Sequence, residues 1–332
     1  MRLILTALAL IAATPTISQE VNVYSYRQPD LIKPLTDAFT AETGIPVNVA
    51  FLDTGMVERL LAEGDRTPAD VILTSDISRL ARAVDAGVTQ SVSSAQMTAN
   101  IPANFRDPAG HWFGLTTRAR IIYASKDRVA EGEITTYEDL TNPKWADRIC
   151  SRSGTHAYST GLISAAIQHL GKSGARDWLA GIKANLARKP QGNDRAQIKA
   201  IWAGQCDIAL GNTYYMGQML QNPEQLEWAN AVRLEFPVFE GGGTHVNVSG
   251  VAMTKAAPHA EDALRFMEFL ASPAAQEIYA ETNFEYPVAA NTAPSDLVAS
   301  WGSYTPDDIN LMDMAGFRGD ALRLAEEVDF DG

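Results

Sequence analysis

The stretch that decides the fold of this chain is CDIALGNTYYMG, residues 206–217. Its first half is a short apolar run, which predicts a buried strand. Its second half carries two adjacent tyrosines, Tyr214 and Tyr215, and leads into a helix-like segment that begins at Gly217. The tyrosine pair therefore falls at a strand-to-helix turn, where α/β proteins commonly bind ligands.

The same alternation of strand and helix appears near the start of the chain. Apolar and β-branched runs predict strands, and helical apolar spacing predicts helices. The strands are expected at residues 21–26, 46–52 and 69–75, and the helices at 31–43, 56–63 and 77–86. This order predicts an α/β protein with a largely parallel sheet covered by helices.

Two long β-rich runs are candidate crossover strands between two lobes. They are RARIIYAS at residues 118–125 and THVNVSGVAMT at residues 244–254, and a second α/β set lies between them. One hydrophobic core seldom organises more than about 250–300 residues, so two lobes are expected. We place residues 19–118 and 245–332, with the C-terminal helices, in the N-terminal lobe. Residues 119–244 form an inserted C-terminal lobe that carries the tyrosines.

Residues 1–18 have the pattern of a secretory signal peptide. Arg2 precedes an apolar run from Leu3 to Ala13, and small residues lead to an expected cleavage after Ser18. The run is about half the roughly 20 residues that a membrane-spanning helix needs. We therefore expect an exported, soluble protein.

Charge and cysteine content narrow the class of partner. The chain has a formal net charge of −13 at pH 7, which argues against nucleic acid and anionic membrane because both need a basic surface. An oxidising compartment allows a disulfide between Cys150 and Cys206, although free thiols stay open as the alternative.

Tyrosine side chains suit a hard cation when they are deprotonated. A phenolate oxygen is a hard, anionic donor, and tyrosine is a known iron ligand in some haem proteins. The free phenol titrates near pH ~10, so the cation must displace a proton and binding should weaken in acid. A tyrosine pair alone also occurs in packed cores and in pockets for organic ligands.

The whole exported chain resembles the periplasmic ferric-binding proteins of ABC iron importers. The segments that carry the resemblance are VNVYSYRQP, PADVILTSD, WFGLTTRARIIYAS, TYEDLTNPKWADRIC, NLARKPQGNDRAQIKAIWAGQCDIALGNTYYMG, GTHVNVSG and EYPV. The resemblance implies a type II periplasmic binding fold and a monomeric, non-enzymatic protein that delivers Fe(III) to an inner-membrane permease. It also implies Tyr158, Tyr214 and Tyr215 as iron ligands.

One motif departs from the usual pattern of that family. Where many members have a histidine after the first strand, this chain has Arg27-Gln28-Pro29. It thus looks like the subgroup with three tyrosine ligands and a synergistic anion. Carbonate is the first expectation for this anion, and phosphate and citrate stay open as alternatives. The resemblance implies that Arg27, Gln28 and Arg118 hold or support the anion, in line with the bidentate geometry of guanidinium groups. Tyr26 is a candidate extra ligand.

Two other functions remain open at this point. The first is a binding protein for a small organic solute such as a polyamine or thiamine, in which the aromatic rings would stack on the ligand. The second is an exported metal-dependent hydrolase, which needs an open metal position and a nearby base. No HExxH, P-loop or G-x-S-x-G motif supports an enzyme.

Overall fold

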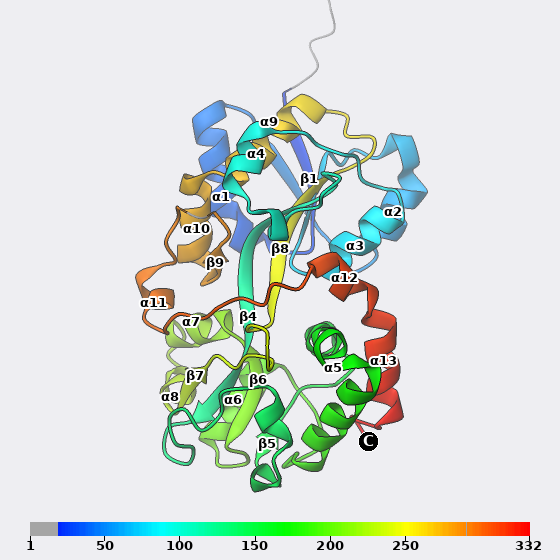
Figure 1. Ribbon diagram of the computed structural model, residues 1–332. Coiled ribbons are helices and arrows are strands. Elements are labelled where there is room, and N and C mark those ends of the chain that lie inside the picture. Colours follow the sequence, from blue (N-terminus) through cyan, green and yellow to red (C-terminus); the bar gives the residue numbers. More distant parts are fainter. Residues whose placement is uncertain (1–18, 290) are drawn as a thin grey trace, which may run out of the picture.

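The computed structural model describes residues 19–289 and 291–332 and shows two lobes joined by long strands (Figure 1). The expected signal peptide at residues 1–18 lies outside the described residues. In the described part of the chain, no helix has the length and apolar character needed to cross a membrane.

The first lobe is built from alternating strands and helices, as the sequence predicted. In chain order they are β1 (Val21–Ser25), α1 (Pro29–Thr43), β2 (Val47–Phe51), α2 (Met56–Glu63), β3 (Val71–Thr74), α3 (Ile77–Asp85) and α4 (Ala95–Asn100). Local signals explain the boundaries. Pro29 starts α1, where its missing N–H costs nothing, and Gly44 ends it with a left-handed φ of 75°.

The second lobe follows the long strand β4 (Phe113–Ser125). It contains β5 (Ile149–Cys150), α5 (Ala157–Ala184), α6 (Asp194–Trp202), β6 (Ile208–Asn212), α7 (Tyr214–Leu220), α8 (Leu226–Asn230) and β7 (Val232–Glu235). Helix α5 breaks at Gly171, which has a left-handed φ of 69°. The helical apolar spacing of the sequence predicts two helices here, near residues 161–170 and 174–186, one on each side of this break.

The chain then returns through β8 (Val246–Met253) and adds a series of short elements. These are α9 (Ala260–Leu270), α10 (Pro273–Asn283), β9 (Tyr286–Pro287), α11 (Asp296–Ala299), α12 (Leu311–Gly316) and α13 (Arg318–Glu327). Helices α9 and α10 pack near α1 in the first lobe, whereas α13 lies along α5 in the second. The sequence had placed all of residues 245–332 with the first lobe. The end of the chain instead packs on the inserted lobe, because α13 buries Ala321 and Leu324 in the core that contains Ile163 of α5.

One strand order runs through both lobes, β2-β1-β3-β8-β4-β6-β5, with β7 and β9 also paired to β4. The expectation of a largely parallel sheet was wrong. Strands β1, β2 and β3 pair in parallel, as do β5 and β6, but every pairing of β4 and β8 is antiparallel. The strands β4 and β8 pass between the lobes in opposite directions, and each runs antiparallel to the strands beside it.

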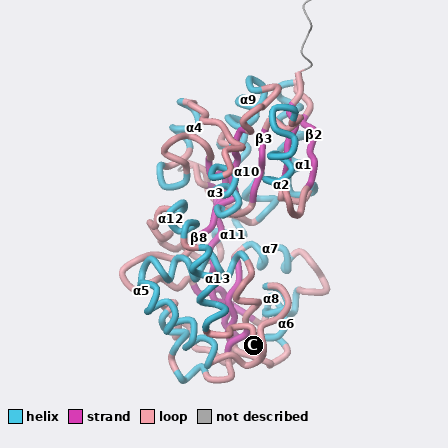
Figure 2. The backbone as a smooth tube through the Cα atoms, turned by 90° about the vertical axis from the view of Figure 1, so that its right-hand side faces the viewer, coloured by secondary structure: helices cyan, strands magenta, loops and turns pink. Residues whose placement is uncertain are grey.

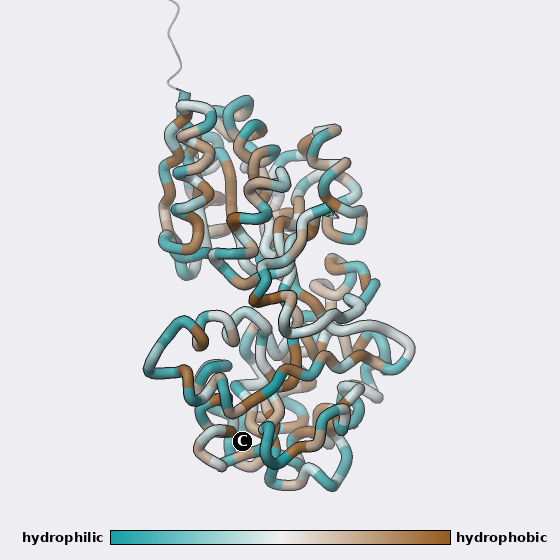
Figure 3. The backbone as a smooth tube through the Cα atoms, turned by 90° about the vertical axis from the view of Figure 1, so that its left-hand side faces the viewer, coloured by the Kyte–Doolittle hydropathy of each residue, from teal (hydrophilic) through white to brown (hydrophobic). Residues whose placement is uncertain are grey.

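Strand β4 changes partners partway along its length. Residues 113–119 pair with β8, and residues 120–125 pair with β6 or β7. Figure 2 shows the strands running through the middle of the molecule with helices outside them, and Figure 3 shows apolar segments in both lobes. Arg118 and Arg120 therefore flank the point where β4 passes from one lobe to the other.

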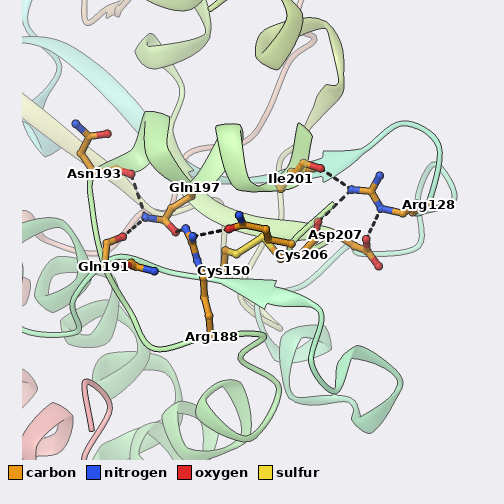
Figure 4. The surroundings of a disulfide bond; sticks show 10 residues. Arg128, Cys150, Arg188, Gln191, Asn193, Gln197, Ile201, Cys206 and Asp207 are labelled. Carbon is orange, nitrogen blue, oxygen red and sulfur yellow. Dashed lines mark hydrogen bonds and ion pairs between the residues drawn. A yellow bond between two sulfur atoms is a disulfide. The ribbon is translucent and has the colours of Figure 1, made fainter. Parts of the chain in front are cut away.

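Cys150 of β5 and Cys206, just before β6, form a disulfide (Figure 4). The bond closes a sequence separation of 56 residues and ties the start of the strand that leads to the tyrosine pair. Beside it, the exposed Arg128 and the half-exposed Arg148 both pair with Asp207.

Candidate functional site

A cleft of about 530 Å³ lies where the two lobes face each other. It is lined by Tyr26, Arg27, Gln28, Leu31, Ser75, Arg118, Tyr158, Arg195, Tyr214, Tyr215, Gln218, Gln221, Thr282, Asn283, Phe284 and Glu285. Every tyrosine, arginine and glutamine that the sequence marked as a candidate site residue lines this cleft. A larger hollow of about 840 Å³ beside α5 and α12 is lined by no tyrosine and no arginine.

The three tyrosines come from the starts of two helices. Tyr214 and Tyr215 are the first residues of α7, directly after β6, and Tyr158 is the second residue of α5. The hydroxyls of Tyr158 and Tyr214 lie 3.2 Å apart. The ring centroids of Tyr214 and Tyr215 are 4.3 Å apart. The structure thus brings Tyr158 next to a tyrosine pair that begins 56 residues further along the chain.

Burial and mutual proximity keep two of these phenols protonated in the empty protein. Burial, together with the neighbouring Tyr158 and Tyr215, raises the pKa of Tyr214 well above its ordinary value. Burial, Tyr158 and Asp194 raise the pKa of Tyr215 to about 12. A ligand that needs phenolates must therefore carry enough positive charge to displace these protons.

A buried carboxylate supports the tyrosines from the second lobe. Asp194, at the start of α6, accepts hydrogen bonds from Arg120 at 2.6 Å and from Arg152 at 2.8 Å. It also accepts the backbone N–H of Asn212 at 3.0 Å, which fixes the end of β6 just before the tyrosine turn. The guanidinium carbon of Arg152 lies 5.1 Å from the centroid of the Tyr158 ring.

Sequence reasoning missed Asp194, which lies in the polar stretch KPQGNDR, residues 189–195. The one local signal was an acidic residue opening a helix, and that pattern is usually explained by the helix dipole alone.

A second buried carboxylate lies on the opposite wall of the cleft. Glu285, which follows α10, accepts hydrogen bonds from Arg27 at 2.8 and 3.1 Å. The hydroxyl of Ser249 donates to it at 3.1 Å, and the hydroxyl of Thr116 also donates to it. Glu285 is part of the EYPV motif, which the sequence marked only as a sign of the family.

Arg118 belongs to this second group but is only partly satisfied. Its Nη1 donates to the Ser249 hydroxyl at 2.9 Å. Its Nε and Nη2 are buried and have no hydrogen-bond partner within the described residues. Buried polar atoms are normally paired, so two donor nitrogens without a partner, on a residue that lines a cleft, are suited to an acceptor ligand.

The other candidates on the first lobe are placed differently. The Tyr26 hydroxyl accepts the backbone N–H of Met56 at 3.0 Å, and the guanidinium of Arg79 lies 3.9 Å from its ring centroid. Gln28 is exposed and precedes α1 without capping it through its side chain. Tyr26 is thus engaged at the start of α2, and the exposed side chain of Gln28 makes no hydrogen bond to the described residues.

The site offers phenols and arginines rather than the commoner metal-ligating groups. Across residues 19–289 and 291–332, no cluster of three or more His, Cys, Asp or Glu side chains is placed to hold a metal ion. His156 is close to Tyr158, but its Nδ1 accepts the Tyr158 backbone N–H at 3.1 Å. Burial, Arg152 and Arg120 lower the pKa of His156 to about 4, so it is neutral at pH 7.

The chain is similar to known proteins over nearly its whole length. Residues 66–304 match the family model described as bacterial extracellular solute-binding protein. The chain is 42% identical to iron uptake protein A1 of Synechocystis sp., over 96% of this chain and 90% of that protein.

Solved structures give the same picture. The ferric iron-binding protein A of Mannheimia haemolytica, solved in an open conformation, matches with a TM-score of 0.91 and 48% identity, over 95% of this chain and 99% of that one. A Trichodesmium protein in complex with iron and citrate ligands matches with a TM-score of 0.90 and 41% identity, over 94% of this chain and 99% of that one.

Proposed function

The chain belongs to the family of bacterial extracellular solute-binding proteins, and on that basis we propose that it captures Fe(III) and hands it to an ABC importer. The family resemblance read from the sequence, the two-lobed α/β fold and the ferric-binding function are confirmed by the relatives, which are iron uptake and ferric iron-binding proteins. These relatives are solute-binding proteins and not enzymes.

The observation that carries the proposal is the gathering of three phenols on one wall of the cleft. We propose that Tyr158, Tyr214 and Tyr215 bind Fe(III) as phenolates. Three phenolates would neutralise the three charges of the ion, and the hard oxygen donors suit a hard cation. The guanidinium groups of Arg152 and Arg120 near Tyr158 would help to stabilise the negative rings.

An anion would complete the coordination of the metal. Arg27, Gln28 and Arg118 line the wall opposite the tyrosines, and two side-chain nitrogens of Arg118 have no hydrogen-bond partner among the described residues. We propose carbonate as this anion, because a planar oxyanion can accept two parallel hydrogen bonds from a guanidinium edge. The crossing strands β4 and β8 would then act as hinges that close the lobes on the metal.

The setting of the protein follows from the family. We propose that the mature protein acts as a monomer in the periplasm and delivers iron to a permease in the inner membrane. The signal-peptide pattern at residues 1–18 supports export.

An organic cation is a poorer candidate for this cleft. Such a ligand needs a free carboxylate, and the one acidic residue among the described lining residues, Glu285, already pairs with Arg27. The relatives with iron in their names likewise do not favour it.

Absorption spectroscopy tests the metal assignment. Loading with Fe(III) should produce a visible phenolate-to-iron charge-transfer band at one iron per chain. The double variant Tyr214→Phe, Tyr215→Phe should lose the band, because it removes two of the three donor oxygens.

Tyr304→Phe is the matched control, since it removes a phenol outside the cleft and should retain both the band and the stoichiometry. Full colour and stoichiometry in the double variant would contradict the proposal.

A further inference from the structure

The wall opposite the tyrosines contains a negative charge that an anion site would not be expected to have. Glu285 is buried, with 2% of its surface exposed. Burial alone raises the pKa of its carboxyl, but Arg27 and Arg118 outweigh burial and lower that pKa below its usual range. Glu285 is therefore a carboxylate at neutral pH and repels any anion that enters the cleft.

The position of this carboxylate is built into the fold. Phe284, the residue before it, has a left-handed φ of 55°, which is uncommon for a bulky side chain. Its ring packs on Gly217 of α7 so closely that a Cβ at Gly217 would lie 2.2 Å from the ring. The segment that carries Glu285 is thus anchored to the helix that carries Tyr214 and Tyr215, and surrounding contacts sustain the unusual backbone.

The charge of an anion, more than its size, is expected to decide how well it fits this cleft. Its volume of about 530 Å³ is within the usual range for small-molecule sites, roughly 300–1,000 Å³, so a bulky polycarboxylate is not excluded by space. Three arginines, Arg27, Arg118 and Arg195, and one glutamate, Glu285, are the charged residues that line it. Three positive charges against one negative charge leave a net formal charge of +2.

We infer that Glu285 sets which anion accompanies the metal, by holding the lining of the cleft at a net charge of +2. This inference rests on the proposed function, in which Fe(III) and three phenolates form a neutral unit. The lining then matches a doubly charged oxyanion such as carbonate. A triply charged anion such as citrate would leave one negative charge uncompensated in a partly buried cleft, where Coulomb interactions are strong.

Changing the lining charge by one unit in each direction tests the inference. Glu285→Gln keeps the size and hydrogen-bonding shape of the side chain but raises the lining charge to +3. Arg195→Gln, at a half-exposed residue with no salt-bridge partner in the described chain, lowers it to +1. Glu285→Asp keeps the charge and serves as the matched control.

The measurement is the apparent affinity for Fe(III), followed by the charge-transfer band during competition with a chelator. It is made in bicarbonate and in citrate at equal ionic strength. We expect Glu285→Gln to raise the ratio of affinity in citrate to affinity in bicarbonate by about tenfold or more. Arg195→Gln should lower this ratio, and Glu285→Asp should leave it close to that of the unaltered protein.

The outcomes separate this inference from the proposed function. An unchanged ratio in Glu285→Gln overturns the inference while the band persists. If Glu285→Gln does not fold, because Arg27 loses its buried partner, the result with Arg195→Gln decides alone. Absence of the band from the unaltered protein in every anion overturns the proposed function itself.

Discussion

Two buried carboxylates, each beside two arginines, lie on either side of the point where β4 passes between the lobes. Glu285 lies with Arg27 and Arg118 in the first lobe, and Asp194 lies with Arg120 and Arg152 in the second. Arg118 and Arg120 are only two residues apart in β4. The difference lies in what the arginines face, since Arg27 and Arg118 line the cleft and Arg120 and Arg152 do not.

The comparison teaches that residue type and burial alone do not distinguish a carboxylate–arginine group that supports the fold from one that can bind a ligand. Both carboxylate oxygens of Asp194 accept hydrogen bonds, from two arginines and from the backbone N–H of Asn212. The group therefore fixes the end of β6. Glu285 neutralises one arginine, while two nitrogens of the neighbouring Arg118 have no hydrogen-bond partner in the part of the chain that the structure describes. The first arrangement can hold a ligand-bearing turn in place, and the second can accept a ligand.

The largest expected effect comes from breaking the supporting group. Asp194→Ala leaves Arg120 and Arg152, both largely buried, without their partner. Removing one partner of a buried ion pair typically costs about 3–5 kcal/mol, so the free energy of unfolding should fall by about that amount. Chemical denaturation followed by circular dichroism measures it.

Asp207→Ala is the control for this prediction, because Asp207 also lies between two arginines, but both of those arginines are partly exposed. Its partners Arg128 and Arg148 have side chains that are 37% and 32% exposed. Exposed pairs contribute about 0–1 kcal/mol. Equal losses in the two variants would show that the buried group has no special supporting role.

An intermediate effect is expected at His245, where the two groups meet. Burial, Arg120, Arg118 and His169 lower the pKa of His245 to about 3. The unfolded chain binds a proton at this residue below about pH 6.5, and the folded protein does not. The contribution of His245 to stability is therefore complete above pH 6.5 and falls by about 1.4 kcal/mol for each pH unit below it, until about pH 3.

Unfolding experiments between pH 7 and pH 5 check this slope, with His245→Asn for comparison. The variant should lose this part of the pH dependence and keep the part that arises from His156, whose pKa is also lowered. Identical slopes in both proteins would mean that burial and the neighbouring arginines do not lower the pKa of His245 as described.

The local parts of this picture were predictable from the sequence. The strand, turn and helix around Tyr214 follow from a short apolar run and a change of periodicity, and both signals lie within about a dozen residues. Tyr158 was singled out only by the resemblance to ferric-binding proteins. Its approach to Tyr214 cannot be read from either segment alone.

The two carboxylate–arginine groups could not be predicted from the sequence, because the partners in each group are far apart in the chain. Arg27 and Glu285 are separated by 258 residues, and Arg120 and Asp194 by 74. The direction of β8 and the packing of α13 on α5 also depend on how the chain returns between the lobes. Local periodicity contains no information about that return, so the sheet was wrongly predicted as largely parallel.

The smallest expected effect concerns Tyr26 on the first lobe. Its hydroxyl is engaged by the N–H of Met56, so we expect Tyr26→Phe to change the affinity for Fe(III) by less than about threefold, or roughly 0.6 kcal/mol. Chelator competition measures the affinity. A loss of tenfold or more, with a shifted charge-transfer band, would make Tyr26 a fourth ligand and would end the one-lobe account of metal binding.

The most direct test of the central claim is a crystal structure of the iron-loaded protein, with iron located by its anomalous scattering. The account predicts one iron ion bound by the phenolic oxygens of Tyr158, Tyr214 and Tyr215, with an anion between the iron and Arg118 and with Glu285 still paired to Arg27. An iron ion bound by histidine or carboxylate side chains, or located away from the tyrosine pair, would contradict it.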